Sequence, residues 1–289
     1  MTVKVQTVCI IGTGLIGGSL ALALKKSGFC QRIVGAGRTE TTLMKALELG
    51  VVDHYETDYA EAVKDADIVV VAVPLSAMKN VFEKIAPALS STAVVTDAGS
   101  AKQSVIRDAQ AAFGESSNRF VAGHPIAGTE KSGVTAAFTE LYENRKVILT
   151  PAENTDSDAV NLVSEMWQAA GAEVESMSAQ HHDMVLAGTS HLPHILAFGL
   201  VDCLNNLEEV DEVFRFAAGG FRDFTRIASS DPVMWRDICL SNREDILGMI
   251  KKYEDQLQMI SSALQDSDGD ALIEIFQRAK KARDQFSNQ

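Results

Sequence analysis

Three glycines near the start of the sequence have the spacing of a dinucleotide-binding turn. Gly12, Gly14 and Gly17 form a GxGxxG pattern that follows an apolar run and opens a helical one. The first glycine permits a tight turn, the second lets a pyrophosphate approach the backbone, and the third lets the helix pack on the strand. The helix N-terminus offers N–H donors and partial positive charge. The pattern predicts a cofactor site that includes Leu15 and Ile16.

The residues after the next expected strand indicate which dinucleotide binds. An acidic residue there would hydrogen-bond the 2′-hydroxyl of NAD, but the sequence has Gly37, Arg38 and Thr39. Arg38, helped by Thr39, could hold the 2′-phosphate of NADP, so NADP is favoured and NAD remains possible. Two alternatives stay open: Arg38 is a solvated surface charge, or the register is shifted and Glu40 contacts the ribose.

A histidine between a glycine and a proline is the second feature that could do chemistry. His124 lies where an apolar run gives out, and we expect it in a turn directly after the strand expected over 119–123. Ligands of open α/β sheets lie beyond the carboxyl ends of the strands, where Pro74, Gly99 and Ser100 are also expected. An imidazole has an unperturbed pKa of about 6.5, which suits proton transfer. His124 is therefore predicted to face a substrate; the alternative is a turn-stabilising surface histidine.

Two further histidines share a helix face in the stretch SHLPH. His191 and His194 are three residues apart, and Pro193 requires a helix start nearby, with Ser190 as a plausible N-cap. A core histidine bonded to a carbonyl is the ordinary explanation. A metal site would combine four histidines but lacks the HExxH pattern, so no metal is predicted; the four are His181, His182, His191 and His194.

An arginine in the stretch GGFRDFTRIA is suited to binding a carboxylate. Asp223 and Arg226 are three residues apart and would share a helix face. The guanidinium is planar and bidentate, and Asp223 could hold it in place; a routine surface ion pair is the alternative. Downstream, Ser230 or Asp231 is expected to cap a helix that carries Trp235, a core residue or a pocket wall.

The order of expected elements divides the chain into two domains. Short β-branched runs alternate with helical segments up to Ser178, which predicts a Rossmann-like, doubly wound parallel sheet with helices on both faces. Helical periodicity prevails afterwards, so an all-α domain over 179–289 is expected to follow the α/β domain over 1–178. Residues 185–207 are apolar nearly all round, which indicates burial in a second core or against another subunit. The expected strands are 3–11, 32–37, 67–74, 93–99, 119–123, 146–151 and 173–177.

Composition restricts the class of protein. The net charge of −13 argues against a protein that binds the phosphate backbone of nucleic acid. The four cysteines lack CxxC spacing and indicate reduced, intracellular thiols. No signal-peptide pattern precedes the first strand, and the longest uncharged apolar run, Ile68 to Met78, is too short for a bilayer. We therefore expect a cytoplasmic protein without a membrane segment.

Taken together, these motifs resemble the prephenate/arogenate dehydrogenase family of tyrosine biosynthesis. The similarity runs across most of the chain, and the combination of motifs is highly specific. The resemblance implies a nucleotide-binding domain followed by a helical dimerisation domain, and hence a homodimer. The motifs are GTGLIGGSLALAL, VAVPLSAM, TDAGSAK, GHPIAGTEKSG, SHLPHILAFGLVD and GGFRDFTRIASSDPVMWRDI.

The resemblance also implies a reaction and roles for individual residues. The family oxidises a cyclohexadienol at C4: hydride passes to the nicotinamide, a base takes the hydroxyl proton, and the ring carboxylate leaves as carbon dioxide. His124 would be the base, and Ser100 would hydrogen-bond between His124, the substrate hydroxyl and the nicotinamide. Arg226, oriented by Asp223, would hold the ring carboxylate, and His194 would line the pocket.

Four more residues take roles from the resemblance. Glu130 would lie at the pocket entrance, Trp235 would form a wall, and His182 with Asp183 would be interdomain structure. The substrate is prephenate or arogenate, which differ by one ammonium group, and the sequence leaves that choice open. At 289 residues we expect neither an appended regulatory ACT domain nor a fused chorismate mutase.

Two other functions are compatible with a Rossmann domain followed by helices. A β-hydroxyacid dehydrogenase shares this order but relies on a catalytic lysine, whereas the motifs here centre on His124 and Arg226. A redox sensor that holds NADP without turnover would need neither a base nor a carboxylate clamp. Replacing His124 by Asn separates an enzyme, which would lose activity, from a sensor, which would not.

Overall fold

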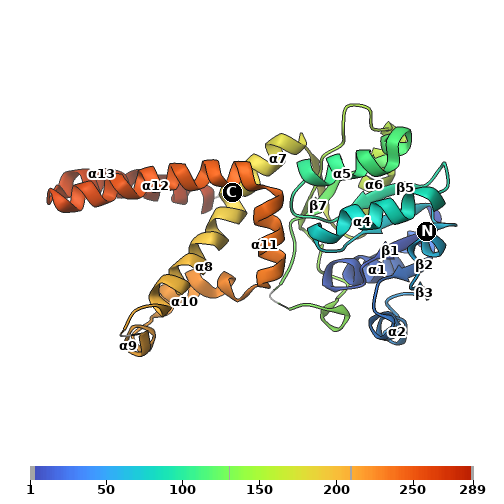
Figure 1. The fold of residues 1–289 in the computed structure, drawn as a ribbon, viewed down its shortest axis with the longest axis horizontal. Helices are drawn as coiled ribbons and strands as arrows, with labels where there is room; N and C mark the ends of the chain where they lie inside the picture. Colours follow the sequence, from blue (N-terminus) through green and yellow to red (C-terminus); the bar gives the residue numbers. More distant parts are fainter. Residues whose placement is uncertain (1–3, 130, 209, 288–289) are drawn as a thin grey trace. The chain divides into compact units, whose positions relative to one another are not determined.

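The computed structural model describes residues 4–129, 131–208 and 210–287. By its internal contacts the chain divides into two compact units, one up to Asn242 and one from Arg243 onward. The first unit contains a six-stranded parallel sheet in the order β3-β2-β1-β4-β5-β6 (Figure 1). Its strands are β1 (Val5–Ile11), β2 (Cys30–Ala36), β3 (His54–Glu56), β4 (Ile68–Val71), β5 (Val94–Asp97) and β6 (Phe120–Val121).

Helices cover both faces of this sheet because its central strands are apolar on both sides. All four residues of β4 are fully buried, as expected for a parallel strand between two helical layers. Along β1, Val8 and Ile10 pack into one core with α1 (Leu15–Ser27) and α6 (Ser157–Ala169). The alternate residues Cys9 and Ile11 pack into a second core with α3 (Tyr59–Val63), α4 (Leu75–Ile85) and α5 (Gln103–Phe113). The predicted doubly wound fold is confirmed.

Two details of the predicted sheet were wrong. The strand β3 was not expected, because its short polar sequence lacks a β-branched run. The strand expected over 119–123 ends at Val121, and a separate strand β7 (Gly123–Pro125) follows. It pairs antiparallel with β8 (Lys146–Leu149), which pairs in parallel with β9 (Glu173–Ser176). His124 therefore lies on a strand of a second, three-stranded sheet rather than in a turn.

A continuous helical stretch of 27 residues, Ala179–Asn205, follows the second sheet. It comprises α7 (Ala179–Leu186), a π-helical turn (Ala187–His191) and α8 (Leu192–Asn205). The expected N-cap at Ser190 was wrong because the helix runs on through the π-turn, which leaves Pro193 in the first turn of α8. By length and composition alone this stretch could cross a membrane, whereas we expected no membrane segment from the sequence.

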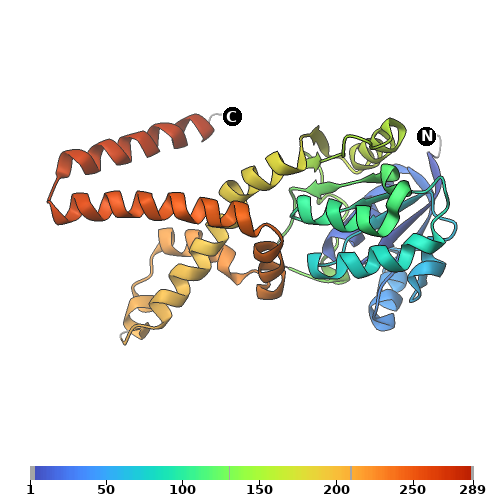
Figure 2. The same cartoon turned by 45° about the horizontal axis from the view of Figure 1, so that its top comes forward.

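The remaining helices are short in the first unit and long in the second. In the first unit α11 follows a capping Asp231, as predicted, and buries Trp235. In the second unit α12 and α13 lie side by side as a hairpin (Figure 2). The bounds are α2 (Glu40–Glu48), α9 (Val210–Arg215), α10 (Gly219–Thr225), α11 (Pro232–Ser241), α12 (Arg243–Gln265) and α13 (Gly269–Ser287), with 3-10 turns at Ala86–Ala88, Gly114–Arg119, Val134–Ala136 and Arg226–Ser229.

Candidate active site

The glycine turn after β1 has the geometry that a dinucleotide requires. Gly12 has a φ of +99°, and a Cβ there would lie 2.3 Å from the carbonyl oxygen of Ala72. A Cβ on Gly17 would lie 2.1 Å from the carbonyl oxygen of Gly12, whereas one on Gly14 would meet only open space. Among the described residues no side chain caps the N-terminus of α1. The turn therefore offers bare amides and room for a pyrophosphate.

A cavity of about 300 Å³ lies beside this turn, at the carboxyl ends of β1, β2 and β4. The strand β2 ends at Ala36, so the predicted register holds and Arg38 borders the cavity while Glu40 does not. Five of the predicted cofactor residues line it: Gly12, Gly14, Arg38, Thr39 and Pro74. Leu15, Ile16 and Gly17 instead pack against the sheet, and Gly99 is buried beside Leu75 and Met78.

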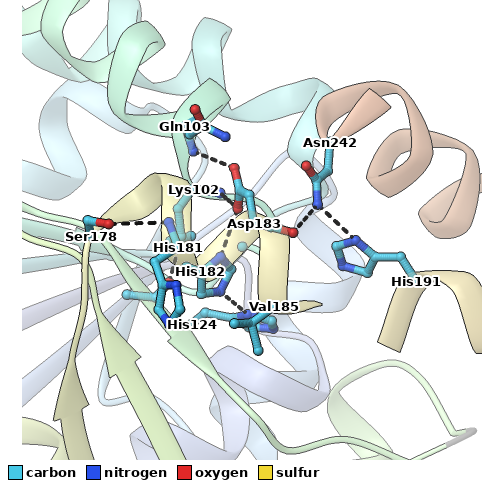
Figure 3. A network of polar contacts seen from close by, with 12 residues as sticks. Lys102, Gln103, His124, Ser178, His181, His182, Asp183, Val185, His191 and Asn242 are labelled. Atoms are coloured by element: carbon cyan, nitrogen blue, oxygen red, sulfur yellow. Dashed lines mark hydrogen bonds and ion pairs between the residues drawn. The ribbon is translucent and has the colours of Figure 1, made fainter. Parts of the chain in front are cut away.

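The candidate base is part of a buried chain of hydrogen bonds (Figure 3). Nδ1 of His124 lies 2.8 Å from Nε2 of His182, and Nδ1 of His182 lies 2.7 Å from Oδ1 of Asp183. His182 and Asp183 are fully buried, and His124 keeps only 8% of its surface exposed. The backbone amides of Lys102 and Gln103 donate to the two carboxylate oxygens of Asp183, at 2.8 and 2.9 Å. Two elements, β7 and α7, thus bring the three side chains together.

A fully buried ion pair lies next to His124. The ammonium of Lys102 donates to Oδ2 of Asp97 at 2.5 Å and to the carbonyl oxygen of Gly123 at 2.6 Å. The other oxygen of Asp97 accepts the amide of Gly123 at 3.1 Å. Asp97 is the last residue of β5 and Gly123 is the first residue of β7. The ion pair therefore holds the end of one strand next to the start of the other. Two of the three donors of the ammonium are therefore taken by Asp97 and Gly123.

The surroundings of His124 disfavour its protonated form. Burial lowers the pKa of His124 well below its usual value, and the neighbouring His182, Lys102 and His191 lower it further. Burial also lowers the pKa of Lys102, although Asp97 opposes this. A neutral imidazole can accept a proton, so the environment keeps His124 in the form a general base needs.

A second cluster gathers the predicted pocket residues of the helical part. The rings of His194 and Trp235 stack with centroids 3.8 Å apart, and His191 lies edge-on to Trp235 at 6.2 Å. Nδ1 of His194 is 2.9 Å from the carbonyl oxygen of Ser190, as a core histidine would be. Burial lowers the pKa of His194, and the nearby guanidinium of Arg226 contributes to that direction.

Asn242 connects the two clusters. Its amide nitrogen donates to the backbone oxygen of Asp183 at 2.8 Å and lies 3.1 Å from Nδ1 of His191. Since the amide nitrogen is a donor, Nδ1 of His191 accepts, and its hydrogen is on Nε2. That Nε2 is buried and has no partner within the part of the chain that the structure describes. A chain of polar contacts thus runs from His124 to His191, whose ring lies edge-on to Trp235.

Several predicted contacts are not formed in the structure. Asp223 and Arg226 are both exposed, and the described residues include no ion pair between them, because α10 ends at Thr225 and Arg226 begins a 3-10 turn. Ser100 follows β5, as predicted, but no hydrogen bond to His124 is formed among the described side chains. Glu130 lies outside the described residues. The described chain contains no group of three or more His, Cys, Asp or Glu placed to hold a metal.

Sequence reasoning missed the residues that surround the base. Lys102 and Asp97 lie in the stretch TDAGSAK, but neither was predicted to have a role. His191 and Asn242 were not predicted to lie near His124. A buried lysine cannot be distinguished from a surface lysine by its neighbours along the chain. The available signal was the pair of adjacent polar residues His182 and Asp183 at the start of an otherwise apolar helix.

Comparison with known families assigns both halves of the chain. The family model described as "Prephenate dehydrogenase, nucleotide-binding domain" matches residues 20–176. The model described as "Prephenate dehydrogenase, dimerization domain" matches residues 178–278. These matches cover well over half of the chain.

Individual relatives are similar over nearly the whole chain. A cyclohexadienyl dehydrogenase of Zymomonas mobilis is 38% identical over 96% of this chain and 94% of its own length. A prephenate dehydrogenase of Bacillus subtilis is 40% identical over 96% of this chain and 76% of its own. The crystal structure of prephenate dehydrogenase from A. aeolicus, in complex with hydroxyphenyl propionate and NAD+, superposes with a TM-score of 0.93 at 39% identity, covering 99% of this chain and 100% of that one.

Proposed function

Because the chain belongs to the prephenate dehydrogenase family, we propose that it catalyses oxidative decarboxylation of prephenate, arogenate or both, with His124 as the base. The products are 4-hydroxyphenylpyruvate from prephenate and tyrosine from arogenate. The observation that carries the proposal is the buried imidazole of His124, hydrogen-bonded through Nδ1 and kept neutral by its surroundings.

We further propose that the nucleotide-binding domain ends at residue 178 and that the protein is cytoplasmic.

In this proposal Nε2 of His124 takes the proton of the C4 hydroxyl. Nδ1 is occupied by His182, so Nε2 is the nitrogen that remains for the substrate. As the proton leaves the hydroxyl, the C4 hydrogen would pass as hydride to a bound nicotinamide and C4 would become a carbonyl. Loss of the ring carboxylate as carbon dioxide would then return its electron pair to the ring, which aromatises to a phenolate and recovers a proton. The buried setting excludes water, which strengthens a hydrogen bond between His124 and the hydroxyl. Ser100, which follows β5, is assigned to the same hydroxyl.

The ring and its carboxylates are assigned to the helical cluster. Arg226 is an unpaired guanidinium among the described residues and is suited to a bidentate carboxylate contact. The stacked rings of Trp235 and His194 are assigned to a wall of this pocket. Asp223, near Arg226 in sequence, and Glu130 are assigned supporting positions at this pocket.

We assign the cavity at the glycine turn to the adenosine and pyrophosphate part of a nicotinamide dinucleotide. When the dinucleotide is bound, its nicotinamide supplies the hydride acceptor. Gly12 and Gly14 would receive the pyrophosphate, and Arg38 with Thr39 would meet the adenosine ribose. The guanidinium of Arg38 and the lack of an acid directly after β2 favour NADP over NAD, although the A. aeolicus relative is a complex with NAD+.

We propose that the protein is a homodimer. The second family model is described as a dimerisation domain, and α12 and α13 leave large apolar side chains exposed: Leu247, Leu257, Met259, Leu264, Ile273 and Phe276. Exposed apolar surface on this scale is typical of a protein–protein interface. Sedimentation at micromolar concentration tests this, and a monomer would contradict it.

A steady-state assay of prephenate and arogenate, each with NAD and with NADP, tests the reaction. Formation of the reduced cofactor together with carbon dioxide is expected with one substrate or both. A folded protein that binds cofactor but gives no turnover in any of the four combinations would contradict the proposal and favour a redox sensor. The ratios of kcat/KM decide the preferred substrate and cofactor.

A further inference from the structure

The buried pair of His182 and Asp183 does more than join two parts of the fold. We propose that this pair is a positioning device that holds His124 in the tautomer with its hydrogen on Nδ1 and its lone pair on Nε2. The inference rests on the proposed function, in which His124 accepts the substrate proton. It assigns His182 and Asp183 a role in that reaction, beyond the interdomain structure expected from the sequence.

The chain begins at the carboxylate of Asp183, which accepts three hydrogen bonds. Burial raises the pKa of Asp183, but the hydrogen bonds from His182 and from the amides of Gln103 and Lys102 outweigh it, so the pKa is lowered overall. These two amides lie at the N-terminus of α5, where a negative charge is favoured. Asp183 is therefore an ionised group that can only accept.

The hydrogen positions on both imidazoles follow from that carboxylate. Oδ1 of Asp183 lies 2.7 Å from Nδ1 of His182, so that nitrogen carries a hydrogen and donates. With a hydrogen on Nδ1, His182 has Nε2 left as its accepting nitrogen, and Nε2 faces Nδ1 of His124 at 2.8 Å. Nδ1 of His124 must donate, which leaves the lone pair of His124 on Nε2. In the opposite arrangement, with the hydrogens on Nε2 of both rings, Asp183 would lose the donor from His182. Nε2 of His124, which accepts the substrate proton in the proposed reaction, would then already carry a hydrogen.

The pair also compensates the charge that the reaction creates. When Nε2 of His124 takes a proton, a cation forms next to the ammonium of Lys102. Asp97 already pairs with that ammonium, so the charge of Asp183 is the one available to the new imidazolium, through His182. Asn242 holds the backbone of Asp183 in place through its carbonyl oxygen at 2.8 Å.

The tautomer can be measured without turnover. We would record side-chain nitrogen-15 spectra of the whole protein labelled at its six histidines, and assign His124 by comparison with His124→Asn. We expect a protonated Nδ1 and an unprotonated Nε2 on His124. A hydrogen on Nε2 of His124 would overturn the inference whether or not the protein turns over prephenate.

Kinetics of two variants at position 182, with a neighbouring control, complete the test. His182→Leu removes the acceptor, and we expect kcat to fall by about 100-fold with KM changed by less than about threefold. His182→Gln supplies a carbonyl oxygen that accepts from Nδ1 of His124, and should recover about tenfold of that loss with the tautomer retained. His181 is adjacent but exposed, so His181→Leu should match the wild type.

The outcomes separate this inference from the proposed function. Equal activity of His182→Leu and His181→Leu, with the tautomer of His124 unchanged, overturns the positioning role and leaves the dehydrogenase intact. A wild type that is inactive with both substrates overturns the proposed function, while the spectra still decide the tautomer. If His182→Leu does not fold, the comparison of His182→Gln with wild type by spectra and kcat decides the question, and loss of the tautomer without loss of kcat contradicts the inference.

Discussion

The glycine turn and the buried imidazole chain are assembled in opposite ways. At the turn, each functional residue follows its own strand directly, so the neighbouring sequence fixes its position. In the imidazole chain, His124 and His182 are 58 residues apart, and Asp183 accepts an amide 81 residues away. The turn presents backbone to a ligand, whereas the imidazole chain orients one nitrogen of one ring.

This difference predicts different responses to substitution. Changes at the cavity are expected to alter cofactor affinity, because the proposed contacts to the cofactor come from separate groups. Changes in the imidazole chain or the Lys102–Asp97 pair alter kcat or stability, because each member satisfies another buried group and removal leaves that group unpaired.

The largest effect is expected for His124→Asn. An amide does not accept and retain a proton as imidazole does, so kcat should fall by about 1,000-fold, close to 4 kcal/mol in activation free energy. Cofactor affinity, measured by fluorescence titration with NADPH, should stay within about twofold of wild type, since the cavity residues are unchanged. A comparable loss of cofactor affinity would show that the two regions are not separate.

Next is Lys102→Met, which leaves the buried carboxylate of Asp97 without its cation. Breaking a fully buried pair costs about 3–5 kcal/mol, and we expect that loss in the free energy of unfolding by urea. Lys26 forms ion pairs on the surface, so Lys26→Met is the matched control. We expect its urea concentration at the midpoint of unfolding to equal that of the wild type. Equal behaviour of the two variants would mean that the buried pair contributes nothing to stability.

A smaller effect concerns His191 and pH. Burial lowers its pKa to about 4, with His182 and His194 contributing and Asp183 opposing. In the unfolded chain this histidine has a pKa of about 6.5, so the unfolded state binds the proton first as the pH falls. The free energy of unfolding therefore decreases between about pH 6.5 and about pH 4, by up to about 3 kcal/mol. We would measure the free energy of unfolding of the wild type and of His191→Gln across this pH range. The difference between the two free energies should shrink towards low pH. A constant difference would contradict the prediction.

The smallest effect is expected for Arg38→Leu at the rim of the cavity. Loss of one exposed guanidinium should weaken NADP binding about tenfold, or about 1.4 kcal/mol, and leave NAD unchanged. Isothermal titration with both cofactors measures this, with Lys79→Leu, a change outside the cavity lining, as a control. Equal effects on NADP and NAD would show that Arg38 does not contact the 2′-phosphate.

Local patterns determined most of the first region. The spacing of Gly12, Gly14 and Gly17, the apolar strands and the capped helix start at Asp231 are each set by neighbours within a few residues. They were predicted correctly because strand and helix periodicity follows from which side chains must leave water. The same reasoning missed β3, whose three residues pair only because β2 offers a free edge.

The reactive groups and the edge of the sheet proposed to bind the cofactor could be identified from residue types and their spacing along the chain. Tertiary structure alone decided that His124 lies on an antiparallel strand and that Lys102 is buried against Asp97. It also decided that His182 and Asp183 face the base rather than solvent. The physical reason is that hydrogen positions and pKa shifts depend on burial and on partners distant along the chain, and both exist only once β5, β7 and α7 have packed together.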